Sequence, residues 1–185
     1  LTPRLFNLDV GDRLLVKPRI AGHYTLEGID RHDDILFLAT GTGQAPHNAM
    51  LGELLAQGHR GKMVIIECNR TFNLFGYEDT LKKLAADNDN VQYQQLVTRE
   101  GPQPCRIQKF IIDSRLESEL DLHLNQKSHV FLCGNPAMIG IPHYNEDGSP
   151  YFSEEGGCIQ LLIENYGLSI HHGHTPGQIY FEKYW

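Results

Sequence analysis

A glycine-rich turn between an apolar run and a helix start constrains the fold of this chain most. Residues 35–39 (ILFLA) form a short unbroken apolar run, which is typical of a strand buried on both faces of a parallel sheet. Residues 40–43 (Thr-Gly-Thr-Gly) follow, and their two glycines let the backbone turn tightly and approach a ligand closely. Pro46 suits the first turn of a helix, because its missing N–H needs no partner there. This order predicts a cradle of free N–H groups for an anion such as a dinucleotide pyrophosphate.

The rest of the chain alternates between apolar runs and helical patterns. The runs predicted to be strands are residues 35–39, 63–68, 91–97, 129–133 and 178–182. The segments predicted to be helices are residues 46–57, 77–86, 107–115 and 158–166. This alternation predicts an α/β fold, a doubly wound parallel sheet that binds ligands at the carboxyl ends of its strands. Residues 140–157 interrupt the rhythm with turn residues, and we interpret them as a surface excursion of unknown role.

Residues 1–30 have a different character and form a candidate second unit. Residues 10–16 and 22–26 are each predicted to be short extended pieces. Two strands cannot form an independent sheet, so this segment must pair with the main domain or be the end of a barrel. We therefore divide the chain into residues 1–30 and a main domain of residues 31–185.

Composition excludes several classes of protein. A chain of 185 residues that is 41% hydrophobic predicts one α/β domain with a sizeable core and a small appendage. The net charge of −7 argues against a nucleic-acid surface, and no apolar run is long enough to span a membrane. The four cysteines form no Cys-x-x-Cys pair, which favours reduced thiols and a cytoplasmic location.

Four motifs together give the chain a family resemblance. Residues 39–46 read Ala-Thr-Gly-Thr-Gly-x-Ala-Pro, residues 98–100 read Thr-Arg-Glu, residues 133–138 read Cys-Gly-Asn-Pro-x-Met, and residues 182–185 read Glu-Lys-Tyr-Trp. In these motifs and their order the chain resembles the ferredoxin–NADP reductase family, particularly its bacterial members. The resemblance implies a ferredoxin reductase-like NADP-binding domain in residues 31–185. It also implies that residues 1–30 are a β remnant, the last strands of a truncated FAD-binding β-barrel.

Arginines at the strand ends indicate which dinucleotide the cradle would take. Arg70 and Arg99 each lie just past a predicted strand, and guanidinium donors match the geometry of a 2′-phosphate. At about 1.5–3 kcal/mol for each charge-assisted bond, two arginines would favour NADP over NAD by about a hundredfold or more. The resemblance assigns this role to Thr98 and Arg99, and also to Arg70 and Arg106. Solvated strand-end arginines are the alternative that the residues alone leave open. Glu67 precedes the strand end, which argues against a ribose-binding acid.

The resemblance also implies a redox site. Cys133 would lie against the nicotinamide where hydride is transferred, helping by packing and orientation, and Glu182 would act beside the flavin–nicotinamide contact. Tyr184 would stack on the flavin and Trp185 would pack near its adenine, while Thr25 would reach one edge of the flavin. From the residues alone, Cys133 could equally be an ordinary core cysteine and Glu182 a surface carboxylate.

The full set of candidate residues follows from these arguments. Cys133 and Glu182 are the catalytic candidates, and no metal site is predicted, because the histidines of residues 171–174 have no cysteine at ligand spacing. The candidates for binding cofactor are Thr40, Gly41, Thr42, Gly43, Pro46, Arg70, Thr98, Arg99, Arg106, Gly134, Asn135, Pro136, Met138, Thr25, Tyr184 and Trp185.

The function implied is that of the NADP(H)-binding portion of a flavin-dependent ferredoxin– or flavodoxin–NADP reductase. Such an oxidoreductase passes a hydride between nicotinamide and FAD and single electrons to or from a carrier, ferredoxin or flavodoxin. We expect the isolated chain to bind NADPH but to have little reductase activity, since most of the FAD site would lie in another domain. Two alternatives stay open: the reductase module of another flavoprotein system, of the oxygenase or sulfide-dehydrogenase type, and a non-catalytic NADP(H)-sensing module.

Overall fold

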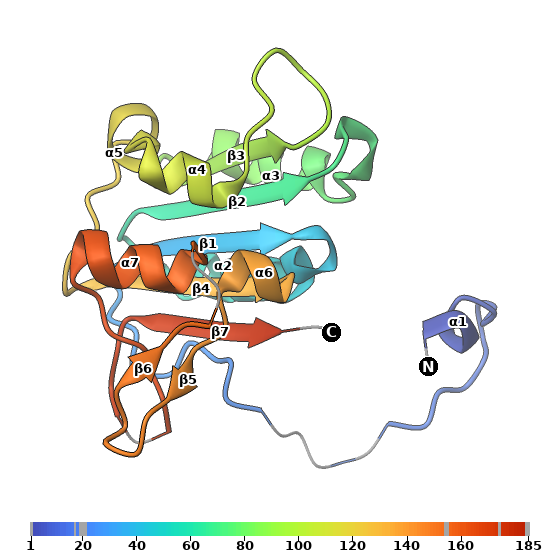
Figure 1. Cartoon of the computed structure of the whole chain (residues 1–185). Coiled ribbons are helices and arrows are strands. Elements are labelled where there is room, and N and C mark those ends of the chain that lie inside the picture. Colours follow the sequence, from blue (N-terminus) through green and yellow to red (C-terminus); the bar gives the residue numbers. More distant parts are fainter. Residues whose placement is uncertain (1, 17, 19–21, 154–155, 174, 184–185) are drawn as a thin grey trace.

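A parallel sheet of five strands forms the centre of the molecule (Figure 1). The structure, a computed structural model, describes residues 2–16, 18, 22–153, 156–173 and 175–183. The strand order is β3-β2-β1-β4-β7, with the first strand of the sequence at the centre. The strands are β1 (Asp34–Thr40), β2 (Met63–Asn69), β3 (Val91–Val97), β4 (Ser128–Gly134) and β7 (Ile179–Lys183).

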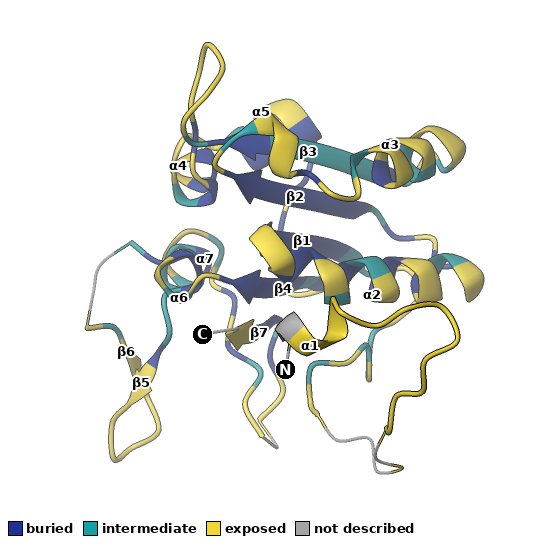
Figure 2. Cartoon of the chain, turned by 90° about the vertical axis from the view of Figure 1, so that its right-hand side faces the viewer, coloured by how far each residue is buried: buried dark blue, intermediate teal, exposed yellow. Residues whose placement is uncertain are grey.

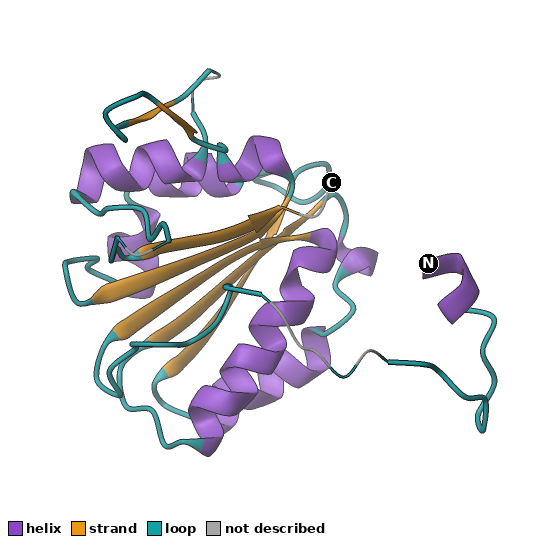
Figure 3. Cartoon of the chain, turned by 90° about the horizontal axis from the view of Figure 1, so that it is seen from below, coloured by secondary structure: helices purple, strands orange, loops and turns teal. Residues whose placement is uncertain are grey.

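Helices cover both faces of this sheet, as Figure 3 shows. One face carries α2 (Gln44–Ala56) and α3 (Glu78–Asp87). The other carries α4 (Ile107–Ile112), α5 (Arg115–Leu120), α6 (Pro136–Ile139) and α7 (Cys158–Tyr166). Successive side chains of a strand point to opposite faces, so β1 alternates between the two cores: Ile35 and Phe37 pack toward α2, and Leu36 and Leu38 toward the opposite layer. The unbroken apolar run of β1 is therefore explained by burial on both sides.

Shorter elements connect these layers. The 3₁₀ turn η1 (Gly41–Gly43) joins β1 to α2, and η2 (Phe72–Leu74) follows β2. An exposed hairpin of β5 (His143–Tyr144) and β6 (Pro150–Tyr151) lies in the excursion between α6 and α7. At the other end of the chain, α1 (Thr2–Leu5) is a single helical turn.

The predicted strands and three of the four predicted helices are confirmed, with bounds that shift by at most two residues. The fourth helix, expected over residues 107–115, is interrupted: Ser114 takes a left-handed conformation with φ of 53°, and α5 begins after it. Residues 10–16 and 22–26, which were expected to be short extended pieces, form no strand among the described residues. A strand needs a hydrogen-bonding neighbour, and these segments pair with no strand of the sheet.

None of the helices in the described ranges has both the length and the apolar character needed to cross a membrane.

Candidate functional site

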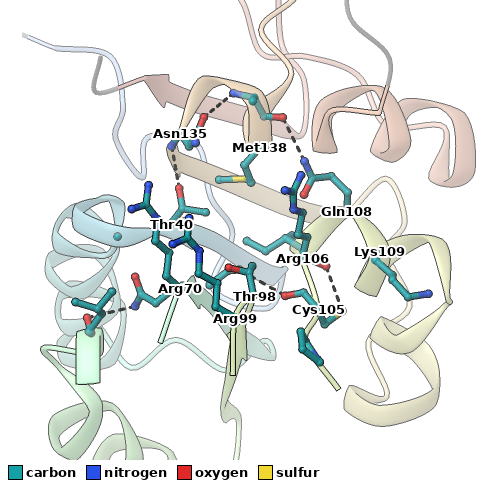
Figure 4. A pocket seen from close by; sticks show the side chains of 17 residues that line it. Thr40, Arg70, Thr98, Arg99, Cys105, Arg106, Gln108, Lys109, Asn135 and Met138 are labelled. Carbon is teal, nitrogen blue, oxygen red and sulfur yellow. Dashed lines mark hydrogen bonds between the residues drawn. The ribbon is translucent and has the colours of Figure 1, made fainter. Parts of the chain in front are cut away.

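A pocket with a volume of about 820 Å³ lies where strands β1 to β4 end (Figure 4). Parallel register brings these ends together, because Thr40 is the partner of Cys68 and Cys68 that of Leu96. The pocket collects eight of the predicted site residues: Thr40, Gly41, Arg70, Thr98, Arg99, Arg106, Asn135 and Met138. Residues that are far apart in the sequence thus line one cavity at the edge expected for a ligand.

Two of the arginines lie side by side because the pairing of β2 with β3 continues past the strand ends. The Thr98 N–H donates to the Asn69 carbonyl and the Arg99 N–H to the Arg70 carbonyl, each at 3.0 Å. Arg106 reaches the same pocket from the segment before α4. In Figure 4 the side chains of Arg70 and Arg99 extend toward Thr40, whereas that of Arg106 extends toward Met138 and Gln108.

The charge of the pocket is strongly positive. No described carboxylate forms an ion pair with Arg70, Arg99 or Arg106. Lys109 also lines the pocket, but its Nζ lies 2.7 Å from Asp113 Oδ2. Among the 17 described residues that line the pocket, none is acidic, although the whole chain has a net charge of −7. Three guanidinium groups without described acidic partners give the pocket the chemistry that suits an anion.

The glycine turn packs directly on the end of β4. The Asn135 N–H donates to Thr40 Oγ1 at 2.8 Å and so ties the ends of β1 and β4 together. A Cβ on Gly134, which has φ of +129°, would lie 2.3 Å from Thr40 Oγ1. A Cβ on Gly43 would lie 2.1 Å from the Cys133 carbonyl oxygen. Gly43 also precedes α2 without a side-chain cap, so the first N–H groups of the helix have no side-chain acceptor at the cap position.

The two catalytic candidates occupy neighbouring positions on adjacent strands. Cys133 is fully buried on β4 and is the register partner of the exposed Glu182 on β7. The carbonyl of Cys133 faces the position of Gly43, so this pair adjoins the glycine turn. Tyr184 and Trp185 lie outside the described residues.

Eight described candidates do not line this pocket: the four that adjoin the glycine turn and the end of β4, Gly43, Gly134, Cys133 and Glu182, and four others. Thr25 and Pro46 border a separate depression of about 550 Å³ between residues 24–27 and α2. Pro136 lines a third depression of about 360 Å³ that reaches the β5–β6 hairpin. Thr42 is exposed within η1.

The pocket also contains residues that were not predicted. They are Cys68, Asn69, Leu74, Pro104, Cys105, Ile107, Gln108, Lys109 and Ala137. Gln108 closes one side, where its Nε2 donates to the Ala137 carbonyl at 3.2 Å. Asn69 is next to Arg70, and Gln108 is two residues after Arg106. This nearness to a predicted arginine was the sequence signal that could have identified them. Leu74 had none, because nothing in its neighbourhood indicates that the chain turns back after β2.

The buried carboxylate of Glu67 makes hydrogen bonds near the end of β2. Glu67 is only 2% exposed and accepts hydrogen bonds from Tyr93 Oη at 2.8 Å and Asn69 Nδ2 at 2.9 Å. Burial raises the pKa of Glu67, although these two hydrogen bonds oppose the shift. Glu67 does not line the pocket, in keeping with the prediction that it binds no ribose.

Comparisons with known proteins place the chain in a class and then a family. Residues 37–143 match the family model described as the oxidoreductase NAD-binding domain. A flavodoxin/ferredoxin–NADP reductase from Buchnera aphidicola subsp. Schizaphis graminum is 30% identical over 190 residues, covering 100% of this chain and 68% of the relative. The corresponding protein of Escherichia coli K12 is 32% identical over 145 residues, covering 75% of this chain and 58% of the relative.

Solved structures of other proteins share the fold of this chain. A ferredoxin NADP⁺ reductase from Neisseria gonorrhoeae, solved with bound FAD and NADP, aligns with a TM-score of 0.68 at 21% identity. The alignment covers 88% of this chain and 61% of that one. The CS-b5R domains of human Ncb5or, in the NAD⁺ form, align with a TM-score of 0.62 at 19% identity, covering 97% of this chain and 44% of that one.

The chain therefore contains an oxidoreductase NAD-binding domain. More narrowly, it belongs to the ferredoxin/flavodoxin–NADP reductase family, as its motifs indicated. It spans about two thirds of the length of the Buchnera relative and 58% of the Escherichia coli relative.

Proposed function

We propose that this chain is the NADP(H)-binding portion of a flavin-dependent ferredoxin– or flavodoxin–NADP reductase. The observation that carries the proposal is the pocket with Arg70, Arg99 and Arg106, whose guanidinium groups have no described carboxylate as partner. A 2′-phosphate carries nearly two negative charges and is the group that distinguishes NADP from NAD. Three forked donors in one pocket suit that phosphate better than an uncharged ribose hydroxyl.

The dinucleotide would extend from this pocket along the glycine turn. Gly41 lines the pocket, and η1 leads directly to the uncapped start of α2, where a pyrophosphate would meet N–H groups. The nicotinamide end would then lie near Cys133 and Glu182, which are neighbours across β4 and β7. In this arrangement Cys133 orients the ring by packing, and Glu182 contributes charge or holds a proton at its carboxylate.

A flavin would supply the link between two-electron and one-electron transfer, which no side chain of this chain provides. The described residues fit only an edge of such a group, because Thr25 lies in a depression apart from the arginine-lined pocket. The proposal therefore assigns most of the flavin site to another part of the protein. Residues 1–30 would be the end of that flavin-binding unit and residues 31–185 the NADP-binding domain.

The same proposal extends to the surroundings of the protein. Relatives named flavodoxin/ferredoxin–NADP reductase suggest flavodoxin or ferredoxin as the electron carrier. The four cysteines form no disulfide with one another, which supports a reducing compartment such as the cytoplasm.

A cofactor titration tests the proposal. The isolated chain should bind NADPH about a hundredfold or more tightly than NADH by isothermal titration calorimetry. Arg99→Ala should weaken NADPH binding about tenfold or more and leave NADH binding almost unchanged, because only NADPH carries the 2′-phosphate. Arg60→Ala, which removes an exposed cation that does not line the pocket, is the matched control and should change neither affinity. Equal affinities for the two nucleotides in the parent protein would refute the proposal.

A further inference from the structure

The loop that carries Arg70 is held in place by three hydrogen bonds to residues outside the loop. We define the Arg70 loop as residues 70–74, which leave β2 and pass through η2. The Phe72 N–H donates to Glu100 Oε2 at 2.9 Å. The Leu74 carbonyl accepts from Asn69 Nδ2 at 3.3 Å. Arg70 itself is tied to the neighbouring strand end through its carbonyl, which accepts the Arg99 N–H.

Glu100 makes its contact from the loop that follows β3. It is exposed and is not among the residues that line the pocket. The following Gly101, with φ of +77°, brings its backbone close to the ring of Phe72: a Cβ built on Gly101 would lie 3.6 Å from Phe72 Cζ. The loops after β2 and β3 are thus joined by a hydrogen bond at a point where Gly101 leaves room beside the Phe72 ring.

The contact between Asn69 and Leu74 is itself supported by the buried carboxylate of Glu67. Asn69 Nδ2 donates to Glu67 Oε1 at 2.9 Å, and Tyr93 Oη donates to Glu67 Oε2 at 2.8 Å. The hydrogen bond to Glu67 therefore fixes the orientation of the Asn69 amide, which also donates to the Leu74 carbonyl. Two side chains therefore hold the Arg70 loop: Asn69 through a partly buried hydrogen bond and Glu100 through an exposed one.

We propose that Glu100 is a positioning residue for phosphate specificity, which it enforces by holding the Arg70 loop so that Arg70 is directed at the phosphate of the adenosine. This inference rests on the proposed function. Donors that are already ordered lose less conformational freedom on binding, so fixing the loop raises the affinity for the phosphate. The carboxylate charge acts in the opposite sense, since it repels an anion in the pocket. The positioning by Glu100 should therefore raise the affinity for the phosphate, whereas its charge should lower it.

Two substitutions of Glu100 separate these effects. Glu100→Gln keeps an oxygen that can accept the Phe72 N–H and removes the charge, whereas Glu100→Ala removes both. The probes are 2′,5′-ADP, which has the additional phosphate, and 5′-AMP, which lacks it, each titrated calorimetrically into the full chain. Glu100→Ala should weaken 2′,5′-ADP binding about threefold to tenfold and change 5′-AMP binding less than about twofold. Glu100→Gln should bind 2′,5′-ADP as tightly as the parent or more tightly.

A double-substitution cycle shows whether Arg70 carries the effect. In an Arg70→Ala background, Glu100→Ala should cause no further loss of 2′,5′-ADP affinity, because the side chain that the loop positions is gone. Asp79→Ala, which removes an exposed carboxylate in the first turn of α3, is the control for charge and should not weaken 2′,5′-ADP binding.

Three results would overturn the inference. The alanine and glutamine variants could change the affinity equally, the loss could persist without Arg70, or both probes could lose affinity together. The proposed function fails separately: a parent protein without preference for 2′,5′-ADP over 5′-AMP would refute it before any variant is compared.

Discussion

At the scale of single residues, His47 places a titratable ring wholly inside the protein. It is 0% exposed, Tyr24 Oη and its Nε2 lie 2.7 Å apart, and the ring packs beside Phe37. Burial lowers the pKa of His47 from its ordinary value of 6.5 to about 3. The imidazole is therefore neutral in the folded protein at any pH near neutrality, and serves as a polar link between residues 22–30 and α2.

This burial predicts a loss of stability in acid. Between pH 6.5 and about pH 3 the unfolded chain binds a proton at His47 that the folded chain does not, so stability falls as the pH falls. From pH 6.5 to pH 5 the contribution is about 2 kcal/mol. Urea unfolding of the parent and of His47→Phe across this range should show a shallower decline in the variant. Glu67, with its raised pKa, acts in the opposite sense in both proteins, and so cancels in the comparison. Parallel declines would contradict the prediction.

The site could be predicted at this scale wherever a residue follows a strand. Arg70, Arg99 and Asn135 were found because the carboxyl ends of parallel strands meet at one edge. Leu74 and Cys105 could not be found, because their places depend on how loops return to the pocket. Thr25 was carried over from the resemblance alone, and the structure places it in a different depression.

At the scale of elements, the contact between β4 and the glycine turn determines the shape of the pocket. Gly134 adopts φ of +129°, which side chains rarely adopt, and its neighbour across the contact is Thr40. A methyl group there would meet both the hydroxyl and the carbonyl of Thr40, at 2.3 and 2.6 Å. The strand end and the turn could then no longer approach each other.

Gly134→Ala should therefore lower the free energy of unfolding by about 2–4 kcal/mol, from overpacking and backbone strain together. Urea denaturation followed by circular dichroism measures it. Gly52→Ala is the matched control, because a Cβ on Gly52, within α2, would have nothing within 4 Å. That variant should be stabilised by about 0.5–1 kcal/mol through helix propensity. A Gly134 variant as stable as the parent would mean that the two elements can separate without cost.

Elements were predictable where their own residues determine them. The five strands of the sheet follow from apolar runs that are buried on both faces, so local pattern and final environment agree. The break between α4 and α5 was missed because Asp113 and Ser114 are only a weak turn signal within an apolar helical pattern; beyond the break, Leu116 and Leu120 pack into the core. The β5–β6 hairpin, two residues a strand, is too short for its alternation to be recognised.

At the scale of the whole molecule, the described residues before residue 30 have two kinds of surroundings. Residues 4–16 expose a series of large apolar side chains, among them Phe6 at 84% and Leu15 at 98% (Figure 2). Tyr24, Leu26 and Ile29, by contrast, pack against the core beneath α2. Three side chains of residues 24–29 therefore contact the core of the main domain across the proposed boundary at residue 30, which stays a prediction. The extended pieces expected over residues 10–16 and 22–26 pair with no strand of the sheet, and of the two only the second contributes side chains, Tyr24 and Leu26, to the packing against the core.

Truncation should distinguish the two halves. Removing residues 1–16 should change the free energy of unfolding by less than about 0.5 kcal/mol, because exposed side chains contribute little burial. Removing residues 1–30 should cost about 2–5 kcal/mol, since it uncovers part of the core and removes Tyr24 from Phe131 and His47. Guanidinium unfolding of both truncated proteins beside the parent measures the difference. If the shorter truncation cost as much as the longer one, residues 1–16 would have to stabilise the folded chain through contacts that their exposure does not reveal, and the whole of residues 1–30 would have to be treated as part of the main domain.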